Sequence, residues 1–202
     1  MPTTLLSSAY LPPINFFTAI NSGGDVLIEQ YDNYCKQTYR NRCRIATAAG
    51  IQTLTIPVVK SDSPKQLMKD VRISSHNDWQ HQHWYALETS YFNSPFFEYL
   101  QDDFRPIYEK QWNFLVDFNE TLIGKCCELL DISPNIARTS YYIGKAAHPI
   151  ESAASEKDLY PIPYYQVFQQ KHGFLPNLSI IDLIFNMGKE STLILAQQAT
   201  QM

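Results

Sequence analysis

The chain has 202 residues, 45% of them apolar and 18% charged, and this balance excludes disorder for most of its length. The formal net charge of −4 disfavours coating of nucleic acid by overall charge, so we expect no nucleic-acid partner. No stretch approaches the ~18 consecutive apolar residues of a membrane span, and with only 7 glycines a glycine-rich repeat or dinucleotide fold is disfavoured.

The N-terminal segment predicts a strand, a short helix and a second strand. Residues 4–10 read as a strand that stops at Pro12 and Pro13, because proline has no amide hydrogen for a ladder and a fixed φ. Residues 14–20 are an apolar helix candidate, and residues 25–31 contain the second apolar strand. A strand, a helical crossover and a second strand in this order predict a βαβ unit with parallel strands.

A hairpin follows, and after residue 75 the pattern becomes helical. Residues 42–48 and 51–59 flank Gly50, which supplies the positive φ of a tight turn. Residues 71–74 read as a further short strand. Helices are expected at 78–91, in a short segment that starts at Pro95 with Ser94 as its cap, and at 107–130 as one helix or two in series. Residues 133–165 read as mostly irregular. Two further helices are expected, at 180–187 between a Ser179–Asp182 capping box and Gly188, and at 190–198.

We therefore expect a mixed α/β fold. A small N-terminal sheet contains the βαβ unit and the hairpin, and the C-terminal half is mainly helical. The pattern changes from sheet-rich at about 1–75 to helix-rich at about 76–202, but no flexible linker marks a boundary. The sequence therefore predicts a single domain over 1–202.

Basic side chains are concentrated after the second predicted strand. Residues 33–75 carry eight basic and two acidic side chains, a local net charge of +6 in a chain that is acidic as a whole. An excess of this size attracts anionic small molecules. The alternative is a solvated basic face with no ligand.

The densest polar segment is Glu29–Arg42. Open α/β sheets hold ligands at the carboxyl ends of parallel strands, and arginine and lysine recognise phosphate. This favours a cradle for an anion or a nucleotide sugar; the alternative is a surface loop tied by Arg–Asp pairs. Tyr10 and Asn15 lie beside this loop if the βαβ prediction holds, with a rigid turn as their alternative role. The candidate ligand-binding residues are Tyr10, Asn15, Gln30, Lys36, Tyr39, Arg40 and Arg42.

Glu29 and His83 are candidate catalytic residues, because carboxylates and imidazoles carry protons in general acid–base catalysis. For His83 the alternative is a packed or helix-surface histidine. His81 and His83 point about 200° apart on a helix, so we predict no metal site. Asp182 and Asn186 lie four residues apart on one helix face and are further ligand-binding candidates, with helix capping as the alternative for Asp182.

The 4 cysteines form no CxxC pair. We therefore expect free thiols in a reducing, cytoplasmic setting. The N-terminus also lacks the basic region of a signal peptide, which favours the same location. Cys35, beside Lys36, is the best candidate for a reactive thiol.

Stretches spread over almost the whole chain resemble the WbqC-like protein family, in its short Bacteroidetes-type form. They are Ser8–Phe17, Glu29–Tyr31, Lys36–Cys43, Leu54–Val58, Trp79 with His83, Ser94–Glu98 and Gly173–Asn186. The first motif of this family often reads His-Gln-Pro before its tyrosine. Residues 7–9 read Ser-Ser-Ala in this chain, so no role of that histidine is carried over.

The resemblance implies a bacterial, cytoplasmic protein linked to the biosynthesis of O-antigen and other surface polysaccharides. It does not imply a particular reaction or cofactor. The pocket that it implies is formed by Tyr10, Gln30, Lys36, Arg40, Asn41 and Arg42, together with His83, Asp182 and Asn186.

The first functional hypothesis is an enzyme that binds a phosphorylated or nucleotide-activated donor and transfers a small group. The basic side chains neutralise the phosphate, and Glu29 or His83 moves a proton. The alternative is a non-catalytic protein-binding module of the same pathway, whose aromatic pairs at 96–97 and 164–165 cover a protein contact. A third hypothesis is thiol-dependent acyl transfer through Cys35. The cofactor and the oligomeric state stay open.

Overall fold

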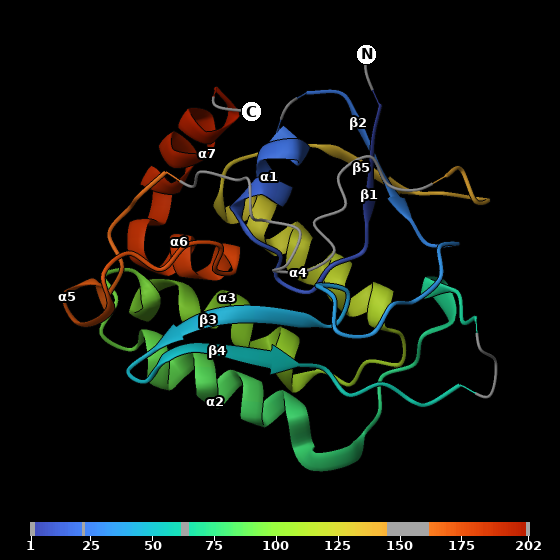
Figure 1. Ribbon diagram of the computed structural model, residues 1–202, viewed down its shortest axis with the longest axis horizontal. Helices are drawn as coiled ribbons and strands as arrows, with labels where there is room; N and C mark the ends of the chain where they lie inside the picture. The colour runs from blue at the N-terminus through green and yellow to red at the C-terminus, as the bar shows by residue number, and fades with distance from the viewer. Residues whose placement is uncertain (1–2, 22, 62–64, 145–161, 201–202) are drawn as a thin grey trace.

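The computed structural model of the chain shows a mixed α/β fold, as the sequence predicts (Figure 1). It describes residues 3–21, 23–61, 65–144 and 162–200. Strands dominate the first part of the chain, and the C-terminal half is mainly helical. The elements lie close to the positions expected from the sequence, with the differences described below.

The predicted βαβ unit is present. Strands β1 (Thr3–Ser7) and β2 (Asp25–Glu29) pair in parallel, and α1 (Ile14–Asn21) connects them. A third strand, β5 (Asn135–Arg138), pairs in parallel with the other side of β2, so the strand order is β1-β2-β5. The sequence predicted irregular structure there, because three of the four β5 side chains are exposed and no apolar alternation marks the strand.

The hairpin is also present, as β3 (Arg42–Thr47) and β4 (Gly50–Thr55). Gly50 has a φ of 112°, which agrees with its predicted turn role. The strand predicted at 71–74 is reduced to single bridges, in which Arg72 pairs with Phe114 and Ile73 with Val58. These bridges still hold the segment after β4 against the start of the helical part.

The next helices are α2 (Trp79–Tyr91), α3 (Phe97–Glu109) and α4 (Leu115–Leu129). Residues 107–130, where one helix or two in series were expected, contain the last residues of α3 and the whole of α4. Helix α3 begins later than predicted. The Ser94 hydroxyl donates to the Tyr91 carbonyl oxygen at 2.7 Å instead of capping a helix that starts at Pro95. Ser94 and Pro95 therefore lie in the turn that precedes α3 and not in the first turn of the helix.

The chain ends in α5 (Gln169–His172), α6 (Ile180–Met187) and α7 (Ser191–Ala199). Ser179 is the N-cap of α6, as predicted, and its Oγ accepts from the Ile181 amide at 3.3 Å. The carboxylate of Asp182 binds tyrosine hydroxyls in the interior instead of closing a capping box. Gly188, with a φ of 54°, ends the helix as expected.

One buried apolar cluster joins these elements. Helix α4 crosses the middle of the molecule, with the three-stranded sheet on one side and the hairpin with α2 on another (Figure 1). The cluster includes Ile28 of β2, Ile45 of β3, Leu122 of α4 and Phe185 of α6, each at most 1% exposed. The sheet-rich and helix-rich parts thus share a core, which is the packing that the predicted single domain requires. No helix among the described residues has the length and apolar character to cross a bilayer.

Candidate functional site

The polar segment that leaves β2 is held in place by residues 66–69. The Tyr34 amide donates to the Gln66 carbonyl oxygen at 2.8 Å, and the Met68 amide donates to the Asp32 carbonyl oxygen at 2.9 Å. These backbone bonds give a loop without regular structure a defined path to β3. The backbone positions of Asp32 and Tyr34 on this loop are therefore fixed.

Arg40 is buried within this segment, with a side chain that is 2% exposed. Its Nη2 donates to Asp32 Oδ2 at 2.8 Å and to Ser7 Oγ at 3.3 Å. Its backbone carbonyl oxygen accepts from Asn119 of α4 at 2.9 Å. This is the Arg–Asp pair of the alternative interpretation, and it ties the carboxyl end of β1 to the loop.

Arg42 and Lys36 instead share a surface depression of about 260 Å³, which we call the basic depression. Arg42 pairs with Thr55 across the hairpin, so its side chain lies beside the segment that follows β4. The residues that line the basic depression are Tyr34, Lys36, Gln37, Asn41, Arg42 and residues 55–58.

Two buried polar atoms in the wall of the basic depression have no hydrogen-bond partner among the described residues. They are Arg42 Nε and Asn41 Oδ1. Asn41 is 5% exposed, and its Nδ2 donates to the Ile56 carbonyl oxygen at 2.9 Å, which fixes the amide. A buried polar group without a partner costs about 1–3 kcal/mol, so a ligand gains affinity when a shift of the wall exposes these atoms to its acceptor and donor groups.

The pKa of Tyr34, which lines the basic depression, indicates positive charge beside it. Burial raises the pKa of the Tyr34 phenol, while the guanidinium groups of Arg42 and Arg40 oppose that rise. The two arginines therefore lie close enough to this ring to stabilise a negative charge on it. The same field favours an anion in the basic depression.

Glu29 and Gln30 hold β2 to the chain that follows β5. The Glu29 carboxylate is 1% exposed and accepts from the Tyr31 amide, the Thr139 hydroxyl and the Ile143 amide at 2.7–3.0 Å. Gln30 Nε2 donates to the Thr139 carbonyl oxygen at 2.7 Å. Glu29 and Gln30 therefore share Thr139 as a partner. None of these hydrogen bonds involves Lys36 or Arg42.

Tyr10 and His83 meet in the interior. The Tyr10 hydroxyl lies 2.9 Å from His83 Nδ1 and 2.9 Å from the Tyr108 hydroxyl. Burial lowers the pKa of His83 to about 4, although a hydrogen bond with the backbone of Thr55 opposes the shift. His83 is therefore neutral at pH 7, and as a neutral ring its two nitrogens act as one donor and one acceptor.

Asp182 and Asn186 form a second buried polar group in α6. Asp182 is fully buried and accepts from the Tyr91 hydroxyl at 2.8 Å, the Tyr164 hydroxyl at 2.7 Å and Gln166 Nε2 at 3.0 Å. Burial raises the pKa of Asp182 to about 6, although these hydrogen bonds lower it. Asn186 Oδ1 accepts from the Val167 amide at 3.0 Å, so both side chains anchor residues 164–167 to α6.

The other candidates have simpler environments. Asn15 and Tyr39 are 4% exposed, and Tyr39 belongs to the apolar core. Cys35 is exposed, whereas Cys43, Cys126 and Cys127 are buried, and all are free thiols. The described residues contain no group of three His, Cys, Asp or Glu side chains that could hold a metal ion.

The structure thus separates the candidate residues into several groups instead of one pocket. Lys36, Asn41 and Arg42 lie together at a surface hollow, while Tyr10 with His83 and Asp182 with Asn186 lie inside the fold. The sequence did not single out Tyr34 or residues 55–58 as part of the hollow. The predicted hairpin was the available signal, because antiparallel pairing across Gly50 places the chain after β4 beside Arg42.

Comparison with known proteins shows the family to which the chain belongs. Residues 7–160 match the WbqC-like protein family. The chain is 29% identical over 218 residues to a protein of Mycobacterium tuberculosis (strain ATCC 25618 / H37Rv) described as "Uncharacterized protein Rv1507c", and the match covers 93% of this chain and 94% of that protein. No solved structure matches. The chain is therefore a member of the WbqC-like protein family.

Proposed function

We propose that the protein binds a phosphorylated small molecule, such as a nucleotide-activated sugar, at the basic depression, and that it transfers a small group in bacterial surface-polysaccharide biosynthesis. The observation that carries the binding step is the pair Arg42 and Asn41. Each contributes a buried polar atom without a partner among the described residues to the wall of a hollow that Lys36 also lines.

The chemistry of these three side chains fits a phosphate that is attached to a polar group. A guanidinium binds phosphate oxygens through directed N–H groups, and an ammonium adds a point charge. Asn41 Oδ1 is an acceptor and suits a hydroxyl or amide donor of the same ligand. Phosphate alone uses the cations, whereas a phosphorylated sugar or nucleotide also uses Asn41.

The transfer step has less support from the contacts. Glu29 accepts three hydrogen bonds in the interior, and His83 is neutral and buried. A catalytic role for either residue stays a prediction that requires the surrounding chain to open. Thiol chemistry at Cys35 also stays a prediction, and its exposure is the feature that supports it.

The alternative of a protein-binding module rested on the aromatic pairs at 96–97 and 164–165. Phe97 and Tyr164 are 2% and 7% exposed, whereas Tyr165 is 50% exposed. Phe97 packs against Trp84 and Phe185, and Tyr164 packs against Phe174. Packing within the fold therefore accounts for Phe97 and Tyr164, and the protein-binding module stays a prediction.

Thermal unfolding with inorganic phosphate, UDP and UDP-glucose tests the proposal. At about ten times its Kd, a ligand that binds only the folded protein raises Tm by about 3–6 °C for a chain of this size. We expect this shift with at least UDP or UDP-glucose, and we expect Arg42→Gln to abolish it.

Arg105→Gln is the matched control, because Arg105 is an exposed arginine on α3 whose Nε lies 2.9 Å from Glu109 Oε1. It should keep the full ligand-induced shift. The proposal fails if no phosphorylated probe stabilises the wild-type protein, or if Arg42→Gln and Arg105→Gln respond alike.

A further inference from the structure

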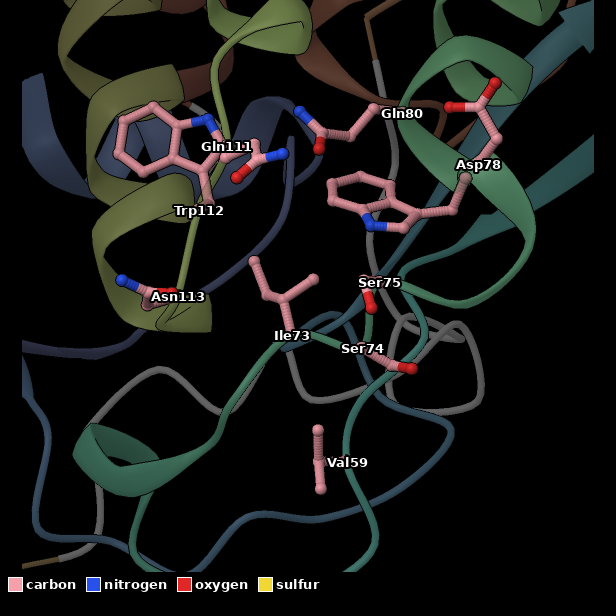
Figure 2. Close-up of a pocket in the computed structure, with 10 residues that line it drawn as sticks. Val59, Ile73, Ser74, Ser75, Asp78, Gln80, Gln111, Trp112 and Asn113 are labelled. Carbon is pink, nitrogen blue, oxygen red and sulfur yellow. The ribbon is translucent and has the colours of Figure 1, made fainter.

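A second hollow of about 430 Å³ lies where the start of α2 meets the segment between α3 and α4 (Figure 2). We call it the tryptophan cavity. Its wall includes Trp79 and Trp112, the amides of Gln80, Gln111 and Asn113, and the hydroxyl of Ser75. It is distinct from the basic depression, although both use the segment after β4: Pro57 and Val58 line the depression, and Val59 lines the cavity.

The two indole rings are held in place by the core. Trp112 Nε1 donates to the Ile107 carbonyl oxygen at 2.8 Å, and the ring meets Phe118 edge-on with centroids 5.6 Å apart. Trp79 meets the same Phe118 edge-on at 5.3 Å and is 5% exposed. Trp112, which is partly exposed, therefore presents a fixed apolar surface to the cavity, and a fixed ring lowers the entropic cost of binding a ligand against it. Little of the Trp79 ring is exposed.

The polar groups of the cavity are amides and hydroxyls, together with the carboxylate of Asp78. Gln80 Nε2 donates to the carbonyl oxygens of Tyr108 and Lys110 at 2.7 and 2.6 Å, so the Gln80 amide is fixed and its Oε1 stays available as an acceptor. Gln111 is exposed and offers both a donor and an acceptor. Figure 2 shows these two amides in the upper part of the view and the hydroxyls of Ser74 and Ser75 below them, with Ile73 beside the serines.

The charge around the cavity is mixed. Asp78 contributes a carboxylate to the wall, and Lys110 Nζ lies 4.4 Å from the centroid of the Trp112 ring. A ligand that fits presents apolar C–H surface to an indole and several hydroxyl groups to amides, and a neutral ligand is repelled by neither charge. A sugar ring combines these properties in one rigid molecule, because its C–H groups lie on its faces and its hydroxyls at its edge.

From this combination we infer that the tryptophan cavity is a binding site for a neutral saccharide. The indole of Trp112 contacts the ring carbons, and the amides of Gln80 and Gln111 hydrogen-bond to hydroxyls. The inference does not depend on the proposed phosphate site, since no residue lines both hollows.

Saturation-transfer NMR with glucose, galactose, N-acetylglucosamine and rhamnose tests the inference, and intrinsic fluorescence provides the affinity. Two of the 3 tryptophans line the cavity, so a bound sugar changes the emission directly. We expect ring-proton signals from at least one of these sugars and a saturable fluorescence change with the same sugar.

Gln111→Ala should weaken that affinity at least fivefold, which corresponds to the loss of one hydrogen bond. Gln101→Ala on α3 is the matched control and should bind as the wild-type protein does.

Trp112→Phe is a second variant and should remove most of the fluorescence response. Arg42→Gln should leave sugar binding unchanged, which separates this inference from the phosphate proposal. Absence of signal with all four sugars, or equal affinities of Gln111→Ala and Gln101→Ala, would overturn the inference.

Discussion

Two buried side chains, Asp182 and His83, are held toward their neutral forms by the same physical cause. Removal from water disfavours a charge, so burial raises the pKa of Asp182 from 3.8 to about 6 and lowers the pKa of His83 from 6.5 to about 4. Each shift corresponds to about 3 kcal/mol of pH-dependent stability. The two contributions have opposite dependence on pH.

The signs follow from which state binds the proton more tightly. Folded Asp182 binds it more tightly than the unfolded chain, so its contribution is complete below about pH 4 and is lost as the pH rises through about 6. Folded His83 binds it less tightly, so its contribution is complete above pH 6.5 and is lost as the pH falls through about 4. Between these limits the two effects oppose one another.

Asp182→Asn should therefore change the pH profile of stability as well as its level. Relative to the wild-type protein, this variant should gain about 3 kcal/mol of unfolding free energy as the pH rises from 4 to 6, because it lacks the group whose stabilisation is lost over that range. Urea unfolding followed by circular dichroism at several pH values measures the difference.

His83→Gln is the mirror-image control, and relative to wild type it should gain stability as the pH falls from 6.5 to 4. Glutamine keeps an acceptor for the Tyr10 hydroxyl and a donor for the Thr55 backbone. A difference from wild type that is the same at every pH would contradict the assigned burial effect for the variant concerned.

The sequence identified these residues as polar positions in apolar surroundings, but it could not show what each one contacts. The Tyr10 hydroxyl lies within hydrogen-bond distance of His83 and Tyr108, which are 73 and 98 residues away along the chain. Asp182 accepts a hydrogen bond from Tyr91, which is 91 residues away. Such partners come from tertiary packing, for which a single sequence carries no local signal.

At the scale of elements, the end of α6 depends on close packing as well as on backbone conformation. Gly188 has a φ of 54°, and a Cβ at this position would lie 2.6 Å from two carbons of the Phe96 ring. Gly50 in the hairpin has a φ of 112°, but a Cβ there would meet nothing within 4 Å. The two glycines separate the backbone effect from the packing effect.

Gly188→Ala should therefore destabilise the protein by about 3–4 kcal/mol, through backbone strain and displacement of Phe96. Gly50→Ala should cost only about 1–2 kcal/mol, because the backbone effect acts alone. Thermal and urea unfolding give both values. Combining Gly188→Ala with Phe96→Ala should cost less than the sum of the single changes, and strict additivity would contradict the packing argument.

The main elements were predictable where their signals are local. Glycine at 50 and 188 marks a real turn and a real helix end, and Ser179 caps α6. The first strand, expected over 4–10 with its stop at Pro12 and Pro13, already ends at Ser7. Strand β5 was not predictable, because its edge position is fixed by pairing with β2 rather than by its own side chains. The serine and proline before α3 were misread, because Ser94 bonds back to Tyr91.

For the whole molecule, the arrangement divides the positive charge of the loop between the interior and the surface. The sequence predicted that basic side chains after β2 would face one hollow. Arg42 and Lys36 do line one, whereas Arg40 forms an internal ion pair with Asp32. Side chains two residues apart took different directions here because Arg40 precedes β3 in a turn and Arg42 begins the strand.

The central claim is that Arg42 binds a phosphate in the basic depression, and the resonance of its Nε–H group tests it most directly. Arg42→Gln assigns the signal by its loss, and the Nε–H of Arg105, which donates to Glu109 at 2.9 Å, serves as the internal reference. On titration with UDP-glucose, the Arg42 proton should move downfield as its Nε gains an acceptor, while the Arg105 signal stays in place. An Arg42 resonance that does not move at saturating ligand, or that moves no more than that of Arg105, would contradict the account.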